Sequence, residues 1–110
     1  DRVNVKVDLN SFYIGENKID LAGFVILDKQ GAKIPINAKE QAILSFLKNK
    51  QGEVVNRLDL LDAIWGENSE VTTRTIDNFI LSIRRKVELD PKQPKYIKSI
   101  RGVGYQLISS

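Results

Sequence analysis

The spacing of the apolar residues changes twice along the chain, and this change most constrains the fold. Up to residue 36 the apolar residues form short runs interrupted by glycines and polar residues, a pattern typical of strands. Over residues 37–90 they recur every three or four positions, as in amphipathic helices. From residue 96 two strand-like runs return. This order predicts an α+β domain with an N-terminal antiparallel β-meander, three helices and a C-terminal β-hairpin.

The first segment predicts short strands at residues 12–14, 19–21, 24–27 and 34–36. Pro35 has no backbone N–H to donate to a ladder, so we expect the last of these strands at a sheet edge. Val3, Val5 and Val7 alternate with polar residues. We therefore interpret residues 1–11 as a linker, an additional strand or a remnant of cloning, followed by one domain over residues 12–110.

Each predicted helix has a start signal. Asn37 is followed three residues later by Glu40, the spacing of a capping box. Asn56 is placed to cap the second helix, and Thr72 or Thr73 to begin the third. Trp65 ends the apolar stripe of the second helix, so we expect it in the core. The stripe predicted for the third helix consists of Ile76, Ile80, Ile83 and Val87.

The composition excludes several classes of chemistry. The 110 residues include no Cys and no His, which removes Cys/His zinc sites, thiol nucleophiles, disulfides and histidine acid–base catalysis. The paired carboxylates Glu67 and Glu70 fall on a predicted loop and have no catalytic companion. We therefore expect no enzymatic activity, no metal and no cofactor.

No apolar run approaches the ~20 residues of a membrane span, and no signal-peptide pattern opens the chain. We therefore expect a cytoplasmic protein without a membrane partner. The chain contains no Met, even at position 1, and we expect it to be a processed product or a piece of a longer protein.

Positive charge is concentrated towards the C-terminus. The whole chain has 17 Lys and Arg against 14 Asp and Glu, a net charge of +3. From Val71 onward there are eight basic and three acidic residues, a net charge of +5. This distribution indicates a basic face for a polyanion. The alternative is an ordinary solvated surface of moderate positive charge.

The third predicted helix carries the candidate base-contacting residues. Arg74, Asn78, Ser82 and Arg85 are spaced by 4, 4 and 3, which predicts one outward band, with Thr75 beside it. Helices that enter a DNA groove need donors and acceptors on such a band, together with cations for phosphates. The alternative is a helix face that contacts only solvent.

The last two strands are joined by Arg101, Gly102, Val103 and Gly104, and the two glycines predict a tight turn with positive φ. An arginine on such a narrow tip suits a minor groove or a phosphate, although a solubilising charge is the alternative. Lys98 and Ser99 on the preceding strand complete the candidate DNA-binding set. Three helices and a basic-tipped hairpin in this order predict a winged helix-turn-helix, in which the third helix enters the major groove.

With these pieces in order, the chain closely resembles the C-terminal DNA-binding domain of OmpR/PhoB-family response regulators. The resemblance covers about residues 12–108. Its most specific stretch is the run from Arg101 to Tyr105, Arg-Gly-Val-Gly-Tyr, which favours this two-component family over one-component membrane-anchored regulators. The matching stretches are residues 36–40, 52–57, 64–66, 74–77, 83–87, 96–100 and 101–105.

The resemblance implies a sequence-specific transcriptional regulator. Such domains follow a phosphorylatable receiver domain, bind tandem repeats of double-stranded DNA as dimers, and place the third helix in the major groove and the wing in the minor groove. Arg74 corresponds to a phosphate-contacting arginine and Arg101 to the wing arginine. RNA polymerase is a further implied partner, through the loop of Glu67, Asn68, Ser69 and Glu70. Because dimerisation resides in the receiver, we expect the isolated chain to be a monomer.

The chain also departs from this family. Leu81 and Ser82 stand where relatives often carry arginines, and Phe79 stands where a histidine is frequent. Leu81 or Phe79 can contact thymine methyl groups or simply pack. The weaker cationic face keeps two alternatives open: a winged-helix module used for protein–protein contact, and a one-component membrane-anchored regulator.

Overall fold

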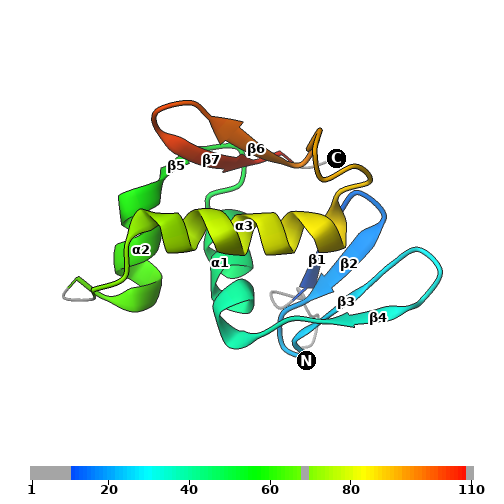
Figure 1. The fold of residues 1–110 in the computed structure, drawn as a ribbon. Coiled ribbons are helices and arrows are strands. Elements are labelled where there is room, and N and C mark those ends of the chain that lie inside the picture. The colour runs from blue at the N-terminus through cyan, green and yellow to red at the C-terminus, as the bar shows by residue number, and fades with distance from the viewer. Residues whose placement is uncertain (1–10, 68–69, 109–110) are drawn as a thin grey trace, which may run out of the picture.

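The computed structural model describes residues 11–67 and 70–108 and confirms the predicted α+β winged-helix class (Figure 1). Most of the segment 1–11 lies outside the described residues; its last residue, Ser11, begins the first strand. The elements in chain order are β1 (Ser11–Ile14), β2 (Asn17–Asp20), β3 (Val25–Leu27), β4 (Lys33–Pro35), α1 (Ala38–Asn49), β5 (Val54–Asn56), α2 (Arg57–Trp65), α3 (Thr73–Val87), β6 (Ile97–Ile100) and β7 (Gly104–Leu107).

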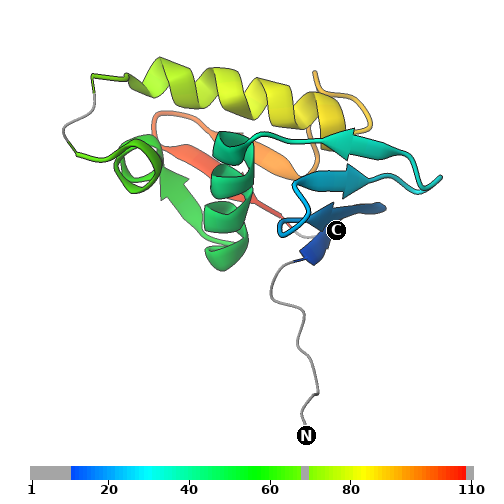
Figure 2. The ribbon, with the colours of Figure 1, turned by 90° about the horizontal axis from the view of Figure 1, so that it is seen from below.

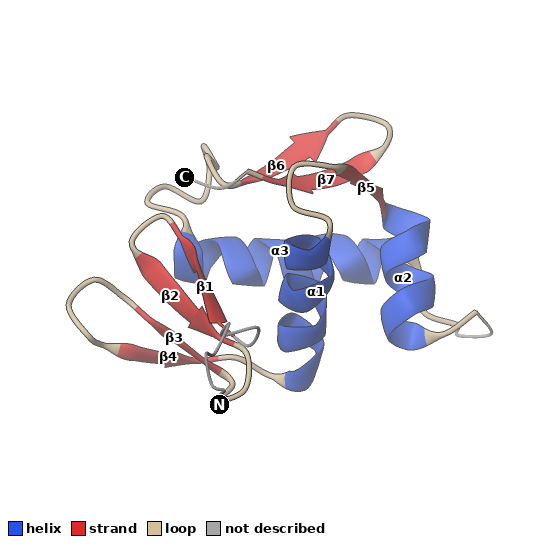
Figure 3. Cartoon of the chain, turned by 180° about the vertical axis from the view of Figure 1, so that it is seen from behind, coloured by secondary structure: helices blue, strands red, loops and turns tan. Residues whose placement is uncertain are grey.

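The N-terminal strands form the predicted antiparallel meander, with the order β1-β2-β3-β4. Ile19 in the middle of β2 pairs with Phe12 on one side and Ile26 on the other, and Ile19 and Ile26 are both buried. Pro35 lies in β4 at the edge of the sheet, as its missing N–H requires. The sheet packs at the C-terminal end of α3 (Figures 1 and 3).

The helix starts also agree with the sequence. The Asn37 side chain accepts from the Glu40 backbone N–H at 2.9 Å, and the Glu40 carboxylate accepts from the Asn37 N–H at 3.0 Å, so the capping box of α1 is complete. Asn56 caps α2 through Leu58, and Thr72 is the N-cap residue of α3 without a side-chain capping bond.

Helix α3 organises the core. Its predicted stripe is buried, with Ile76, Ile80, Ile83 and Val87 at most 2% exposed. The helix crosses the middle of the molecule, with α2 beside its first turns and the N-terminal sheet beside its last (Figures 1 and 2). In the described part of the chain, no helix is both long and apolar enough to cross a membrane.

The C-terminal hairpin belongs to a three-stranded sheet with the order β5-β7-β6. Strand β5 was not predicted, because it has only three residues and only Val55 among them is buried. The hairpin turn has the predicted positive φ, but only one of its two glycines adopts it. Gly102 has φ +78°, but Gly104 lies in β7 without a positive φ, paired with Asn56 of β5.

Candidate nucleic-acid interface

The outward face of α3 is defined by four residues. In this helix, all of whose residues are described, only Arg74, Asn78, Leu81 and Arg85 are exposed. At 100° per residue their directions fall within roughly 60° of one another. The predicted positions of Arg74, Asn78 and Arg85 are therefore confirmed as one outward band, and Leu81 belongs to it. Thr75 is half-buried at its side.

The prediction that Ser82 belongs to this band is wrong. Its hydroxyl donates to Oε2 of Glu40 at 2.6 Å, so the side chain is directed towards α1. A spacing of four residues advances 40° beyond a full turn, and two such steps from Arg74 carry Ser82 out of the outward face. Ser82 therefore joins α3 to α1 at the side of the outward band.

The partner of Ser82 is a buried carboxylate. Glu40 is 1% exposed, and both of its oxygens accept from Nζ of Lys86 at 2.9 Å. Burial raises the pKa of Glu40, but the bonds from Ser82, Lys86 and the Asn37 backbone together outweigh burial and leave the pKa below its ordinary value. The ionised carboxylate therefore fixes α3 against the start of α1.

The basic triplet at the end of α3 points in three directions, as successive helical positions must. Lys86 is held by Glu40, and Arg85 is exposed. Arg84 is buried and donates to the carbonyl oxygen of Ile97 at 2.7 Å and to Oγ of Ser99 at 2.9 Å. Burial lowers the pKa of Arg84. Only Arg85 of the three is presented outward.

The hairpin side of the candidate surface contains Lys98, Ser99 and Arg101, all exposed. The Ser99 hydroxyl already accepts from Arg84, so its position is set by α3. Arg101 lies in the turn that connects β6 and β7. The structure therefore places all three predicted hairpin residues at the surface, and one of them is coupled directly to the helix.

A polar network that the sequence analysis did not identify fixes the hairpin on the helices. The Asp77 carboxylate of α3 accepts from Arg57 of α2 at 2.9 Å and from the Tyr105 hydroxyl of β7 at 2.6 Å. Burial, together with the bond to Asp77, raises the pKa of Tyr105 to about 12, so the phenol stays a donor at neutral pH. All three residues lie in stretches that resemble the OmpR/PhoB family, namely Arg57, Asp77 and Tyr105. They are far apart in the sequence, so no local pattern predicts that they are bonded to one another.

Helix α3 and the hairpin enclose an open groove of about 830 Å³. It brings Leu81 and Arg85 of α3 next to Lys98 and Ser99 of β6. The loop that follows α3 closes its end. The loop residues in the lining are Asp90, Pro91, Lys92 and Pro94. Three exposed cations against one exposed carboxylate make this groove suitable for a polyanion.

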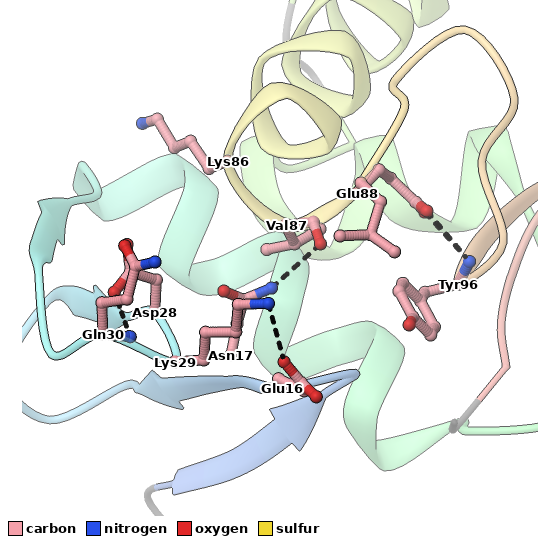
Figure 4. A pocket seen from close by; sticks show the side chains of 10 residues that line it. Glu16, Asn17, Asp28, Lys29, Gln30, Lys86, Val87, Glu88 and Tyr96 are labelled. Atoms are coloured by element: carbon pink, nitrogen blue, oxygen red, sulfur yellow. Dashed lines mark hydrogen bonds and ion pairs between the residues drawn. The ribbon is translucent and has the colours of Figure 1, made fainter.

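A second hollow, of about 370 Å³, lies between the N-terminal sheet and the end of α3 (Figure 4). Its polar groups are used internally. Asn17 donates to the carbonyl oxygen of Val87 at 3.0 Å, and the Glu88 carboxylate accepts the backbone N–H groups of residues 95, 96 and 97. This hollow anchors the C-terminal end of α3, and we assign it no ligand.

The remaining predicted residues lie elsewhere. Trp65 is half-buried at the edge of the core, and its ring centroid lies 5.5 Å from that of Phe79. Glu67 and Glu70 are exposed in the loop between α2 and α3, whereas Asn68 and Ser69 fall outside the described residues. Among the described residues, no three carboxylates converge into a metal site.

This combination of a meander, three helices and a hairpin set against the third helix defines a winged helix-turn-helix domain. Residues 31–107 match the family described as "Transcriptional regulatory protein, C terminal". The chain belongs to this family, the OmpR/PhoB-type C-terminal DNA-binding domains.

Two individual proteins that are similar to this chain are response regulators or sensory transduction proteins. The sensory transduction protein RegX3 of Mycobacterium leprae is 33% identical over 84 residues, which cover 76% of this chain and 42% of RegX3. The structure of the response regulator DrrB, an OmpR/PhoB homologue from Thermotoga maritima, matches with a TM-score of 0.79 and 40% identity, over 91% of this chain and 45% of DrrB. This chain thus spans less than half the length of either protein.

A third match shares the fold at lower identity. The DNA-binding domain of Klebsiella pneumoniae RstA, solved in complex with the RstA box, matches with a TM-score of 0.73 and 22% identity, over 89% of this chain and 96% of the RstA domain.

Proposed function

We propose that this chain binds double-stranded DNA sequence-specifically, as the effector domain of a two-component response regulator. The observation that carries this proposal is the groove in which Leu81 and Arg85 of α3 lie next to Lys98 and Ser99 of the hairpin. In this proposal the outward band of α3 enters the major groove and Arg101 on the wing reaches the minor groove. The RstA domain, which shares the fold, was solved with the RstA box.

The charges support the same docking. Arg74 and Arg85 lie at the two ends of the outward band, and Lys98 and Arg101 are exposed on the hairpin. Asn78 and Leu81 lie between the two arginines along the helix. In this arrangement the outer arginines lie where they can approach phosphates. The two residues between them lie where they can approach base edges.

The lengths of RegX3 and DrrB support a larger parent protein. Both are more than twice as long as their matched region, which leaves room for a receiver domain in the full-length protein. We propose that this receiver supplies dimerisation on tandem repeats, so that the isolated domain is a monomer that gains affinity when two copies are linked. We also propose that RNA polymerase contacts the loop that contains Glu67 and Glu70.

The roles of these two arginines can be tested with Arg74→Ala and Arg101→Ala. Each variant should weaken binding to specific and random DNA alike, because we expect both side chains to contact a phosphate or to sense groove width and not to read one base edge. Each should also reduce the slope of log K against log salt by about 0.9, the effect of one lost phosphate contact. Fluorescence anisotropy at several salt concentrations measures both quantities.

Lys29→Ala is the matched control, since it also removes one exposed cation, from the β3–β4 turn in the N-terminal sheet. It should leave the salt slope unchanged. A slope that stays at the wild-type value in Arg74→Ala or Arg101→Ala would refute the role proposed for that residue.

Base recognition can be tested with Asn78→Ala. Asparagine can bond bidentately to adenine, and loss of such a contact costs about 1–3 kcal/mol on the preferred site. Binding to random DNA should remain almost unchanged. Selection from a random DNA library, performed with wild type and variant, measures the preference at each position. Identical consensus sequences with equal preferences would show that Asn78 contacts no base.

A further inference from the structure

Leu81 differs chemically from the rest of the outward band. Among the four exposed residues of α3, it is the only apolar one, with 46% of its surface exposed. Phe79, the other apolar residue with a potential base-contacting role, packs against Trp65 at a centroid distance of 5.5 Å and is half-buried. The structure thus separates the two: Phe79 belongs to the edge of the core, and Leu81 is presented outward.

The surroundings of Leu81 indicate what it meets when DNA is bound. Asn78 lies one turn before it and Arg85 one turn after it, and Lys98 and Ser99 lie across the groove. A duplex whose phosphates approach the cations of this groove brings its base edges, not its backbone, against the central part of the helix. Leu81 has no donor or acceptor, so it can recognise only an apolar feature of those edges.

The major-groove edges of the four base pairs present one apolar group, the C5 methyl of thymine. We propose that Leu81 is a specificity-determining residue that recognises a thymine methyl group in the preferred DNA site. This inference rests on the proposed DNA binding and deepens it.

The position of Leu81 is fixed by bonds on both sides of the helix. Asp77 is bonded to Arg57 and Tyr105, and Lys86 is bonded to Glu40. These contacts hold α3 against α1, α2 and the hairpin. The Leu81 side chain is therefore carried by a rigid backbone, which favours selective contact with a small group.

The test removes the methyl group from the DNA. After the preferred site has been selected from random sequences, each thymine in turn is replaced by deoxyuridine, which pairs identically but lacks the methyl group. Burial of one methyl group corresponds to about a fourfold change in affinity. Wild-type protein should bind about fourfold more weakly at one or two substituted positions, and Leu81→Ala should bind the thymine and deoxyuridine forms equally well.

Leu89→Ala is the matched control. Leu89 is 80% exposed and lines the hollow beside the N-terminal sheet, so the same exchange is made away from the groove. This variant should keep the wild-type response to deoxyuridine. If Leu81→Ala proves unstable, Leu81→Gln, which keeps the length of the side chain at this exposed position, should likewise lose the response to deoxyuridine.

The outcomes separate the two proposals. If wild-type protein binds all deoxyuridine sites as tightly as the thymine site, or if Leu81→Ala retains the full loss, the role of Leu81 is overturned while DNA binding stands. If the wild-type protein, as the isolated domain and as tandem-linked copies, selects no DNA, the proposed function fails, and the inference about Leu81 with it.

Discussion

Glu40→Ala should lower the free energy of unfolding by about 3 kcal/mol, because it removes the acceptor of a largely buried ion pair. The truncation leaves the Lys86 ammonium, the Ser82 hydroxyl and the Asn37 N–H without the carboxylate that they share. The Lys86 side chain retains 25% exposure, which places the expected cost at the lower end of the range for such pairs. Urea unfolding at pH 7, followed by circular dichroism, measures the loss.

The same site predicts an acid-sensitive stability. The pKa of Glu40 in the folded protein lies below its ordinary value of 4.5, so the fold favours the ionised form. Its contribution is therefore fully present above pH 4.5 and is lost as the pH falls through the lower folded-state pKa. The wild-type stability should decrease in this range by more than that of Glu40→Ala.

Glu16→Ala is the control for a surface carboxylate. Glu16 is 73% exposed and lies 3.6 Å from Lys29, a geometry that contributes at most a few tenths of a kcal/mol. This variant should unfold at nearly the wild-type urea concentration and keep the acid response. A Glu40→Ala protein as stable as Glu16→Ala would show that the buried network contributes nothing net.

Glu40 illustrates what a sequence can predict about such a site. The spacing of Asn37 and Glu40 predicted the capping box, because both residues belong to one turn of helix. The bonds to Ser82 and Lys86 were not predictable, since those residues lie 42 and 46 positions further along the chain. Local chemistry set the start of α1, and the packing of α1 against α3 added the remaining bonds.

The outward band of α3 shows the same division. The apolar stripe fixed which side of the helix is buried, so the exposure of Arg74, Asn78 and Arg85 followed from their positions. Ser82 was assigned to the band because of its spacing from Arg74, Asn78 and Arg85, and Leu81 was left open between contact and packing. A buried carboxylate on another helix holds Ser82, whereas Leu81 lies on the exposed face of the helix.

Strand β5 and the hairpin glycines depended on pairing over long distances. Val54–Asn56 gain their strand structure from β7, about fifty residues later. Gly104 was interpreted as a turn residue because Gly102 precedes it closely. In the structure, a glycine is needed at this position because the backbone of β5 lies against it. The residues around a glycine do not indicate which distant segment of backbone will pack against it.

Gly104→Ala should lower the free energy of unfolding by about 3 kcal/mol, the upper part of the range for overpacking a well-fitted site. An added Cβ would overlap the carbonyl oxygen of Val55, which belongs to the backbone of β5 and cannot rotate away. Either β7 moves away from β5 or the sheet distorts. Urea unfolding measures the loss, and backbone amide chemical shifts of Val54–Asn56 report the displacement of β5.

Gly102→Ala separates this effect from turn geometry. An alanine at Gly102 has open space around its Cβ but must adopt φ +78°, which costs about 1 kcal/mol. We therefore expect Gly104→Ala to be less stable than Gly102→Ala. The chemical shifts of β5 should remain native in Gly102→Ala. Equal losses in the two variants would contradict the close approach at Gly104 and make both glycines ordinary turn residues.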